Sequence, residues 1–194
     1  IQEKRMKGYF IEAAKKIIKE EGVNKLTVKM ISEAAGYAQG TLYNYFDNLD
    51  RLLFYCIKDF FAECKDFVIN KRDNYTKTNE KIINSAIAYS SYFARNPNVY
   101  RLIFMENLTS LPKEEIGEQI YVPEIIKLLR GILEKYAQQG SVKKEDVIII
   151  GDLIRNSIHS NLLFYVNGIK KVSKEEVMNK IENEVDYLLK NYIK

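Results

Sequence analysis

The sequence has no tryptophan, one histidine, two cysteines, three prolines and nine glycines in 194 residues. Because so few residues break helices, and Lys, Glu, Ile and Leu are abundant, helices are favoured over a turn-rich sheet. A single histidine excludes a metal site built on several histidines. Cys56 and Cys64 are eight residues apart with no histidine nearby, a spacing that fits no zinc motif. We therefore expect no metal and no cofactor, and two buried thiols in a reducing compartment.

A long hydrophobic run and a secretory leader are also missing from the sequence. The most apolar stretch, residues 147–166, contains Asp152, Arg155 and His159, so it is too polar to cross a membrane. Residues 2–5 are polar, and no apolar signal-peptide core follows them. These absences predict a cytoplasmic protein with no membrane partner.

Neither sign of charge is in large excess. The sequence has 30 Lys and Arg and 26 Asp and Glu, which gives a net charge of +4. Residues 1–46 carry eight of these basic residues and five of the acidic ones, and so hold most of the excess. A basic N-terminal quarter favours a polyanionic partner at that end of the chain.

Apolar residues recur at spacings of three and four along almost the whole chain, which predicts an all-α protein of about nine helices. The expected helices cover residues 4–21, 28–35, 39–45, 48–70, 80–95, 99–108, 123–139, 144–167 and 174–192. Gly22, Gly36, Gly140 and Gly168 follow four of them as stop signals. Residues 173–176 have the Ser-x-x-Glu pattern of a capping box, which marks the start of the last helix.

Two short helices joined by a glycine-containing turn form a helix-turn-helix pattern over residues 28–46. The second helix of such a motif enters the major groove of DNA. Around it lie amides suited to adenine edges, hydroxyls and phenols that reach phosphates, and a glycine that permits close backbone approach. We predict that DNA is contacted by Thr27, Tyr37, Gln39, Gly40, Thr41, Tyr43, Asn44 and Tyr45.

Several strings at fixed spacings distinguish residues 5–56. They are Leu26-Thr27-Val28, Ile31-Ser32-Glu33-Ala34-Ala35-Gly36, Gly40-Thr41-Leu42-Tyr43-Asn44-Tyr45-Phe46 and Leu52-Leu53, preceded by a helix with an Ala pair that ends Glu-Glu-Gly. Together they closely resemble the DNA-binding domain of the TetR family of transcriptional regulators. The resemblance implies a DNA-binding domain over residues 1–47 and a helical effector-binding and dimerisation domain over residues 48–194. It also implies a homodimer that binds a palindromic operator, most often as a repressor released by a small effector.

The whole sequence has 14 Tyr and 9 Phe, and many of them lie in its C-terminal part. A core built only for packing would prefer Leu and Ile, which have no hydroxyl to satisfy, although simple core filling explains any one of these residues. An apolar pocket with a few polar anchors would use them. The predicted pocket for a small lipophilic effector is lined by Phe60, Phe61, Tyr89, Tyr92, Phe93, Tyr100, Phe104, Asn107, Asn156 and His159.

The expected helix over residues 144–167 is apolar on more than one face. Such a helix is covered on two sides, here by its own domain and by a symmetry mate. The last helix has a matching apolar stripe. We predict a dimer interface formed by Ile154, Ile158, Leu162, Ile181, Val185 and Leu188.

Two other classes of function fit the sequence less well. An enzyme is not supported, because we find no Ser/His/Asp arrangement, phosphate-binding glycine loop or metal cluster. A helical ligand- or protein-binding module that has lost specific DNA binding remains an alternative. Ala38 cannot cap the recognition helix, and Gln39 and Leu49 stand where the family often has Lys. Each missing phosphate contact flattens the salt dependence of DNA binding by about one unit, so we predict a shallow slope.

Overall fold

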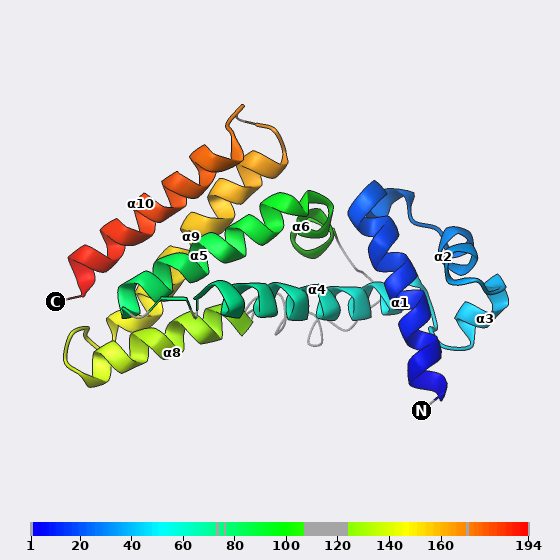
Figure 1. Ribbon diagram of the computed structural model, residues 1–194, viewed down its shortest axis with the longest axis horizontal. Coiled ribbons are helices and arrows are strands. Elements are labelled where there is room, and N and C mark those ends of the chain that lie inside the picture. Colours follow the sequence, from blue (N-terminus) through cyan, green and yellow to red (C-terminus); the bar gives the residue numbers. More distant parts are fainter. Residues whose placement is uncertain (1, 73, 76, 107–123, 170, 194) are drawn as a thin grey trace. The chain divides into compact units, whose positions relative to one another are not determined.

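The computed structural model describes residues 2–72, 74, 75, 77–106, 124–169 and 171–193 (Figure 1). Over these residues the chain forms nine α-helices, one short 3-10 helix and no β-strand. The elements are α1 (Gln2–Glu21), η1 (Val23–Lys25), α2 (Val28–Ala35), α3 (Gln39–Tyr43), α4 (Leu49–Arg72), α5 (Thr78–Arg95), α6 (Pro97–Phe104), α8 (Glu124–Gln138), α9 (Asp146–Val166) and α10 (Lys174–Tyr192). The predicted all-α fold is confirmed. No helix in these ranges is both long and apolar enough to cross a membrane.

Contacts between residues divide the chain into two compact units. Unit 1 comprises Ile1–Ala62 and Asn96–Tyr121, and unit 2 comprises Glu63–Arg95 and Val122–Lys194. The first part of α4 therefore belongs to unit 1 and the rest to unit 2. Helix α6 joins unit 1 because it packs against α1. This division by contacts differs from the boundary at residues 47 and 48, which separates functions and stays a prediction.

In unit 1, helix α1 packs against the α2–α3 pair around a small apolar core. Phe10, Ile18, Ile31, Leu42 and Phe46 are each at most 1% exposed. Burying large side chains of this kind contributes about 1.5–3 kcal/mol each, which holds α1, α2 and α3 in one arrangement. The core therefore fixes the orientation of α3, whose own five residues could not form a stable helix alone.

The turns of unit 1 follow from single residues. The Thr27 hydroxyl accepts a hydrogen bond from the Met30 N–H at 3.2 Å and caps α2. Gly36 ends α2 with φ of 79°, in the left-handed region that glycine adopts without strain. Ala38 offers no side-chain cap to α3. Asn48 caps α4, since its Oδ1 accepts a hydrogen bond from the Arg51 N–H at 2.8 Å.

Unit 2 is a helical bundle in which α5 packs against α8, α9 and α10, and α9 packs against α8 and α10. Its core contains Ile82, Phe93, Leu129, Ile150 and Leu162, all fully buried. At the start of α10 the predicted capping box is present. The Ser173 hydroxyl accepts from the Glu176 N–H at 3.1 Å, and the Ser173 N–H donates to the Glu176 carboxylate at 2.6 Å.

Most predicted helices agree with the observed ones, and the differences have local causes. Helices α2 and α10 have the predicted bounds, and the four stop glycines all have positive φ. Helix α3 ends two residues before the prediction, because the chain tightens into short-range turns over Asn44 and Tyr45. Helix α6 begins at Pro97, where a missing N–H costs nothing, and the end predicted at residue 108 lies outside the described residues.

Candidate nucleic-acid interface and effector site

The outer surface of α3 is bare. Leu42 is fully buried and anchors the helix, whereas Gln39, Gly40, Tyr43 and Asn44 are exposed, with 55% of Tyr43 accessible. A Cβ built on Gly40 would meet nothing within 4 Å in the described part of the chain. A short helix that presents amides, a phenol and naked backbone has the form needed to enter a DNA groove.

Two of the predicted DNA contacts, Tyr37 and Tyr45, have rings that pack inside unit 1. The Tyr37 ring centroid lies 5.5 Å from that of Phe10 and 6.1 Å from that of Tyr9. The Tyr45 ring lies 6.2 Å from Phe10. Both side chains are half-buried. Their rings therefore help to fix α1 against the helix-turn-helix, and contact of their hydroxyls with DNA stays a prediction.

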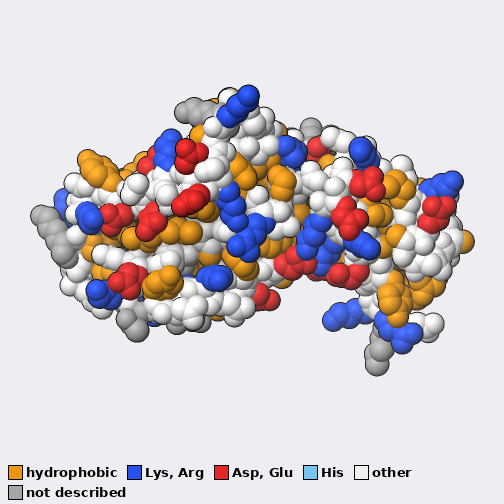
Figure 2. Space-filling model, turned by 45° about the horizontal axis from the view of Figure 1, so that its top comes forward, with side chains coloured by type: hydrophobic (Ala, Val, Ile, Leu, Met, Phe, Trp, Pro, Cys, Tyr) orange, Lys and Arg blue, Asp and Glu red, His pale blue; other side chains and the backbone are white. Residues whose placement is uncertain are grey.

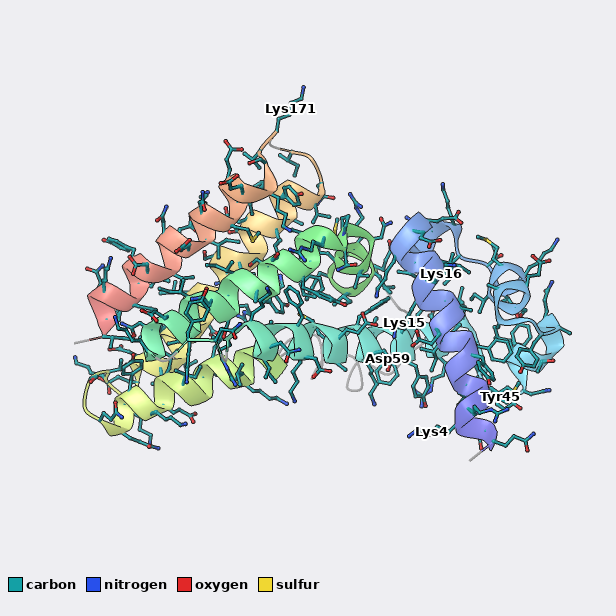
Figure 3. The ribbon with its side chains drawn as sticks, in the orientation of Figure 1. Lys4, Lys15, Lys16, Tyr45, Asp59 and Lys171 are labelled. Atoms are coloured by element: carbon teal, nitrogen blue, oxygen red, sulfur yellow. The ribbon has the colours of Figure 1, made fainter. Side chains whose placement is uncertain are left out.

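Thr27 and Thr41 complete the predicted set on unit 1. Thr27 is exposed at the start of α2, and its oxygen is engaged as the helix cap while its O–H remains a donor. Thr41 is half-buried in α3. Lys4 projects from the first turn of α1 (Figure 3). On the face shown in Figure 2, charges of both signs are intermixed over both units.

The predicted effector-site residues divide between the units. Tyr89, Tyr92, Phe93 and His159 come together in unit 2, where the Phe93 ring centroid lies 4.9 Å from that of Tyr89 and 5.2 Å from that of Tyr92. The Tyr89 hydroxyl lies 3.5 Å from His159 Nε2. Burial, assisted by the charge of Arg155, lowers the pKa of His159 to about 4. The imidazole is therefore neutral at neutral pH.

Tyr92 has a polar partner that the sequence did not indicate. Its O–H donates to the Glu63 Oε2 at 3.1 Å, and the Phe67 ring lies 6.2 Å from the Tyr92 ring. Burial and the neighbouring carboxylate raise the pKa of Tyr92 far above its usual range. The phenol therefore stays protonated and serves as a donor.

The other predicted pocket residues lie elsewhere. In unit 1, the Phe104 ring lies 6.4 Å from Phe61 and 4.9 Å from Tyr100, and burial raises the pKa of Tyr100 to about 12. Phe60 is buried in the same unit. Asn156 is exposed on the outer face of α9, opposite the core, so it is not part of the aromatic group of unit 2. Asn107 lies outside the described residues.

The predicted dimer residues need correction. Ile154, Ile158, Leu162, Ile181 and Val185 are each at most 1% exposed, and they pack α9 against its neighbours within one chain. Leu188 is half-buried. Residues so deeply buried cannot contact a second chain without repacking the core. The helix is nevertheless apolar on two faces, because other residues form an exposed one: Ile148, Ile149, Leu153, Leu163 and Phe164.

Comparisons with known proteins agree with this architecture. Residues 10–56 match the family model of the tetR family of bacterial regulatory proteins. The fatty acid metabolism regulator protein of Bacillus subtilis is 25% identical over 176 residues, covering 88% of this chain and 89% of that protein. The structure of the regulator FadR from Bacillus subtilis in complex with stearoyl-CoA is similar, with a TM-score of 0.73, 24% identity and coverage of 92% and 96% of the two chains. PfmR, a TetR family regulator from Thermus thermophilus, has a TM-score of 0.62, 19% identity and coverage of 93% and 97%.

Residues 10–56 thus carry the helix-turn-helix domain of the tetR family of bacterial regulatory proteins. The family model covers the helix-turn-helix and the segments that brace it, in the same region as the predicted resemblance. The structural likenesses show that the shared fold extends over nearly the whole chain.

One contact in unit 1 could have been suspected from the sequence and was missed. Lys15 is buried in α1, and its Nζ lies 2.8 Å from Glu12 Oε1 and 3.4 Å from Asp59 Oδ2 of α4 (Figure 3). The ammonium also lies 5.8 Å from the centroid of the Phe60 ring. A lysine within the apolar stripe, with a glutamate three residues earlier, was the available signal. The contact joins α1 to the beginning of α4.

A second contact joins α6 to the end of α1 in unit 1. Asn98 Nδ2 donates to the Lys19 carbonyl oxygen at 3.2 Å, in the last turn of α1. Its Oδ1 accepts from Arg101 Nη1 at 3.3 Å. The Asn98 side chain also lies against Gly22, where φ is 86°. No sequence pattern indicated this contact, because it joins residues 79 apart.

Proposed function

We propose that this regulator represses transcription by binding a palindromic operator as a homodimer, and that a long-chain acyl-CoA thioester releases it. The observation that carries the DNA-binding part is the bare outer surface of α3. Gln39, Tyr43 and Asn44 project from a helix whose Leu42 is locked into the core. A protein with this role acts in the bacterial cytoplasm.

The choice of effector rests on chemistry within unit 2 and on the relatives. Tyr89, Tyr92 and Phe93 form an aromatic group with few polar atoms, among them the neutral His159 imidazole. Mostly apolar surroundings with a few polar anchors suit a ligand with a long acyl chain. A relative of similar fold binds stearoyl-CoA, and another is a regulator of fatty acid metabolism.

The homodimer rests on the exposed apolar face of α9. Ile148 and Ile149 are 58% and 53% exposed, and Leu163 and Phe164 are each 40% exposed near the other end of the helix. In a two-fold dimer the same patch of each chain packs on its copy, which would bury this face. Two recognition helices then read half-sites separated by about 34 Å, one turn of DNA, or by a multiple of it.

Release requires the effector to prefer one of two states of the regulator. Two covalent routes lead from unit 2 to unit 1. Helix α4 contributes to both units, and α5, which carries Tyr89 and Phe93, continues through Pro97 into α6. Helix α6 in turn holds the end of α1 through Asn98. A coupling of about 1–3 kcal/mol along these routes would change operator affinity 5- to 150-fold.

The experiment is a titration of labelled DNA from upstream of the regulator's own coding region, followed by fluorescence anisotropy at two salt concentrations. A scrambled duplex is the control. We expect the upstream DNA to be preferred about a thousandfold, the usual ratio of specific to nonspecific binding. Stearoyl-CoA, but neither stearate nor free coenzyme A, should then release the protein.

Each outcome has a definite meaning. Specific binding that no acyl-CoA reverses would refute the effector and leave the operator binding intact. Equal and weak binding to both duplexes calls for a selection from random DNA. If that selection also enriches no sequence, the repressor proposal fails, and the helical ligand-binding module without DNA function replaces it.

A further inference from the structure

Two arginines and an aspartate meet where α8 packs against α9 in unit 2. Arg130 Nη2 lies 3.0 Å from Asp152 Oδ1, and Arg155 Nη2 lies 3.5 Å from the same oxygen. The side chains of Arg130, Arg155 and Asp152 are 28%, 30% and 38% exposed. Two guanidinium groups thus share one carboxylate oxygen at the surface, and the three side chains together carry a net charge of +1.

Arg130 is seated against the backbone of α9. A Cβ built on Gly151 would lie 3.4 Å from Arg130 Cγ and 3.6 Å from Arg130 Nε. Glycine weakens the interior of a helix, but here its missing side chain leaves the space that the arginine occupies. Arg130 Nε is buried and has no hydrogen-bond acceptor among the described residues. A buried donor without an acceptor is costly, so the position of Arg130 is not explained by packing alone.

The charged cluster leads directly to the aromatic group. Asp152, Arg155 and His159 follow one another at spacings of three and four, which places them on one face of α9. The His159 ring centroid lies 5.9 Å from that of Tyr89, which packs on Phe93. One face of α9 thus passes, within about two turns, from the partly exposed Asp152 and Arg155 to His159, which lies beside buried aromatic rings.

We propose that Arg130 and Arg155 bind the phosphate groups of the effector while its acyl chain extends toward Tyr89 and Phe93. This assignment rests on the proposed function, in which the effector is an acyl-CoA. The planar, five-donor guanidinium matches phosphate oxygens better than the ammonium of lysine does. Asp152 acts as a positioning residue, because its one oxygen holds both guanidinium groups. All three side chains are partly exposed, so a phosphate group can reach them from solvent.

The cluster would distinguish two sources of negative charge. A free fatty acid ends in one carboxylate, whereas a coenzyme A thioester has no carboxylate on its acyl part and offers several phosphate oxygens. Removing one arginine should therefore weaken binding of the thioester and leave binding of the fatty acid unchanged. Without this cluster in the site, both ligands would respond alike to such a change.

The test is isothermal titration calorimetry of the full chain with stearoyl-CoA, stearate and free coenzyme A. Arg130→Gln and Arg155→Gln should each weaken the binding of stearoyl-CoA at least tenfold, the effect of losing one charge-assisted contact. In both variants the dissociation constant for stearate should stay within twofold of the parent value, and operator affinity should be unchanged. Lys171→Gln is the matched control, since it removes one positive charge from an exposed residue of the loop before α10 (Figure 3). It should bind stearoyl-CoA like the parent.

Three results would overturn one proposal or the other. If the parent protein binds no stearoyl-CoA, the effector in the proposed function is wrong. If the parent binds it and both glutamine variants bind equally well, the phosphate assignment fails and the effector stands. If the variants weaken stearate as much as the thioester, the cluster does not recognise phosphate. Arg130→Lys and Arg155→Lys keep the charge in case a glutamine variant unfolds, and each should weaken the thioester at least threefold with stearate unchanged.

Discussion

At the scale of single residues, packing within the chain explains the identity of some residues of α3 and not of others. Leu42 is fully buried and sets the position of α3, whereas a Cβ built on Gly40, two residues earlier, would meet no described atom within 4 Å. The fold gives no reason for a glycine there. The reason we infer is the close approach of DNA to the backbone.

Gly40→Ala should therefore harm DNA binding without harming the fold. An alanine raises helix propensity by up to about 1 kcal/mol, so thermal stability should be unchanged or higher. Operator affinity should fall at least tenfold, because the new methyl group lies between backbone and DNA. Gly131→Ala in α8, which also meets nothing within 4 Å, is the matched control for both measurements. Unchanged operator affinity in Gly40→Ala would show that α3 does not approach DNA at this position.

His159 makes a second prediction at this scale, because it is the single histidine of the sequence. Its pKa is about 4 in the folded chain and about 6.5 when unfolded, so the unfolded chain binds the proton more tightly. Its contribution to stability is complete above pH 6.5 and is lost as the pH falls toward 4. Between pH 7.5 and 5 the loss should be about 2 kcal/mol in urea unfolding. His159→Gln should lack this component, and an identical pH profile would contradict the assigned pKa.

At the scale of elements, the junction of α1 and α4 shows how a charged residue can serve as packing. The Lys15 stem is buried, while its ammonium reaches Glu12 and Asp59, whose side chains are 69% and 47% exposed. Ion pairs with exposed carboxylates contribute little, about 0–1 kcal/mol. The buried methylenes should therefore stabilise the junction more than the charge does.

Lys15→Met and Lys15→Ala separate these contributions. Methionine keeps the length of the stem, so the free energy of unfolding should stay within about 1 kcal/mol of the parent. Alanine leaves a void between α1 and α4 and should lose about 2–3 kcal/mol. The exposed neighbour Lys16 is the control (Figure 3), since Lys16→Ala should change stability by less than about 0.5 kcal/mol. If Lys15→Met were as destabilising as Lys15→Ala, the charge would be the larger contribution.

Elements are also the scale at which the sequence was most informative. The spacing of apolar residues predicted every described α-helix but not the short η1, and Gly36 and Ser173 marked ends that the structure reproduces. The same spacing could not tell which apolar face of α9 lies inside, so Ile154 and Ile158 were assigned to the wrong side. Contacts between distant residues, such as Asn98 with the end of α1, depend on three-dimensional packing that local patterns do not encode.

At the scale of the whole molecule, the exposed face of α9 sets the expected assembly. An apolar side chain near a two-fold axis meets its own copy, so Leu163→Glu would place like charges close together. The variant should sediment as a monomer at micromolar concentration, where the parent is a dimer. Ile169→Glu is the matched control, because Ile169 is 63% exposed but follows the end of α9. A monomeric parent, or a dimeric Leu163→Glu, would show that this face is not the interface.

The two cysteines equip the molecule with an internal reporter. Cys56 lies in unit 1 and Cys64 in unit 2, and burial raises the pKa of each thiol well above its usual value. A thiol reagent can therefore modify them only when the surrounding unit opens. The rate of modification then measures how often that unit opens. Each unit thus has its own thiol, whose modification can be followed separately. Operator DNA should slow modification of Cys56, and an effector bound among the aromatic rings should slow modification of Cys64.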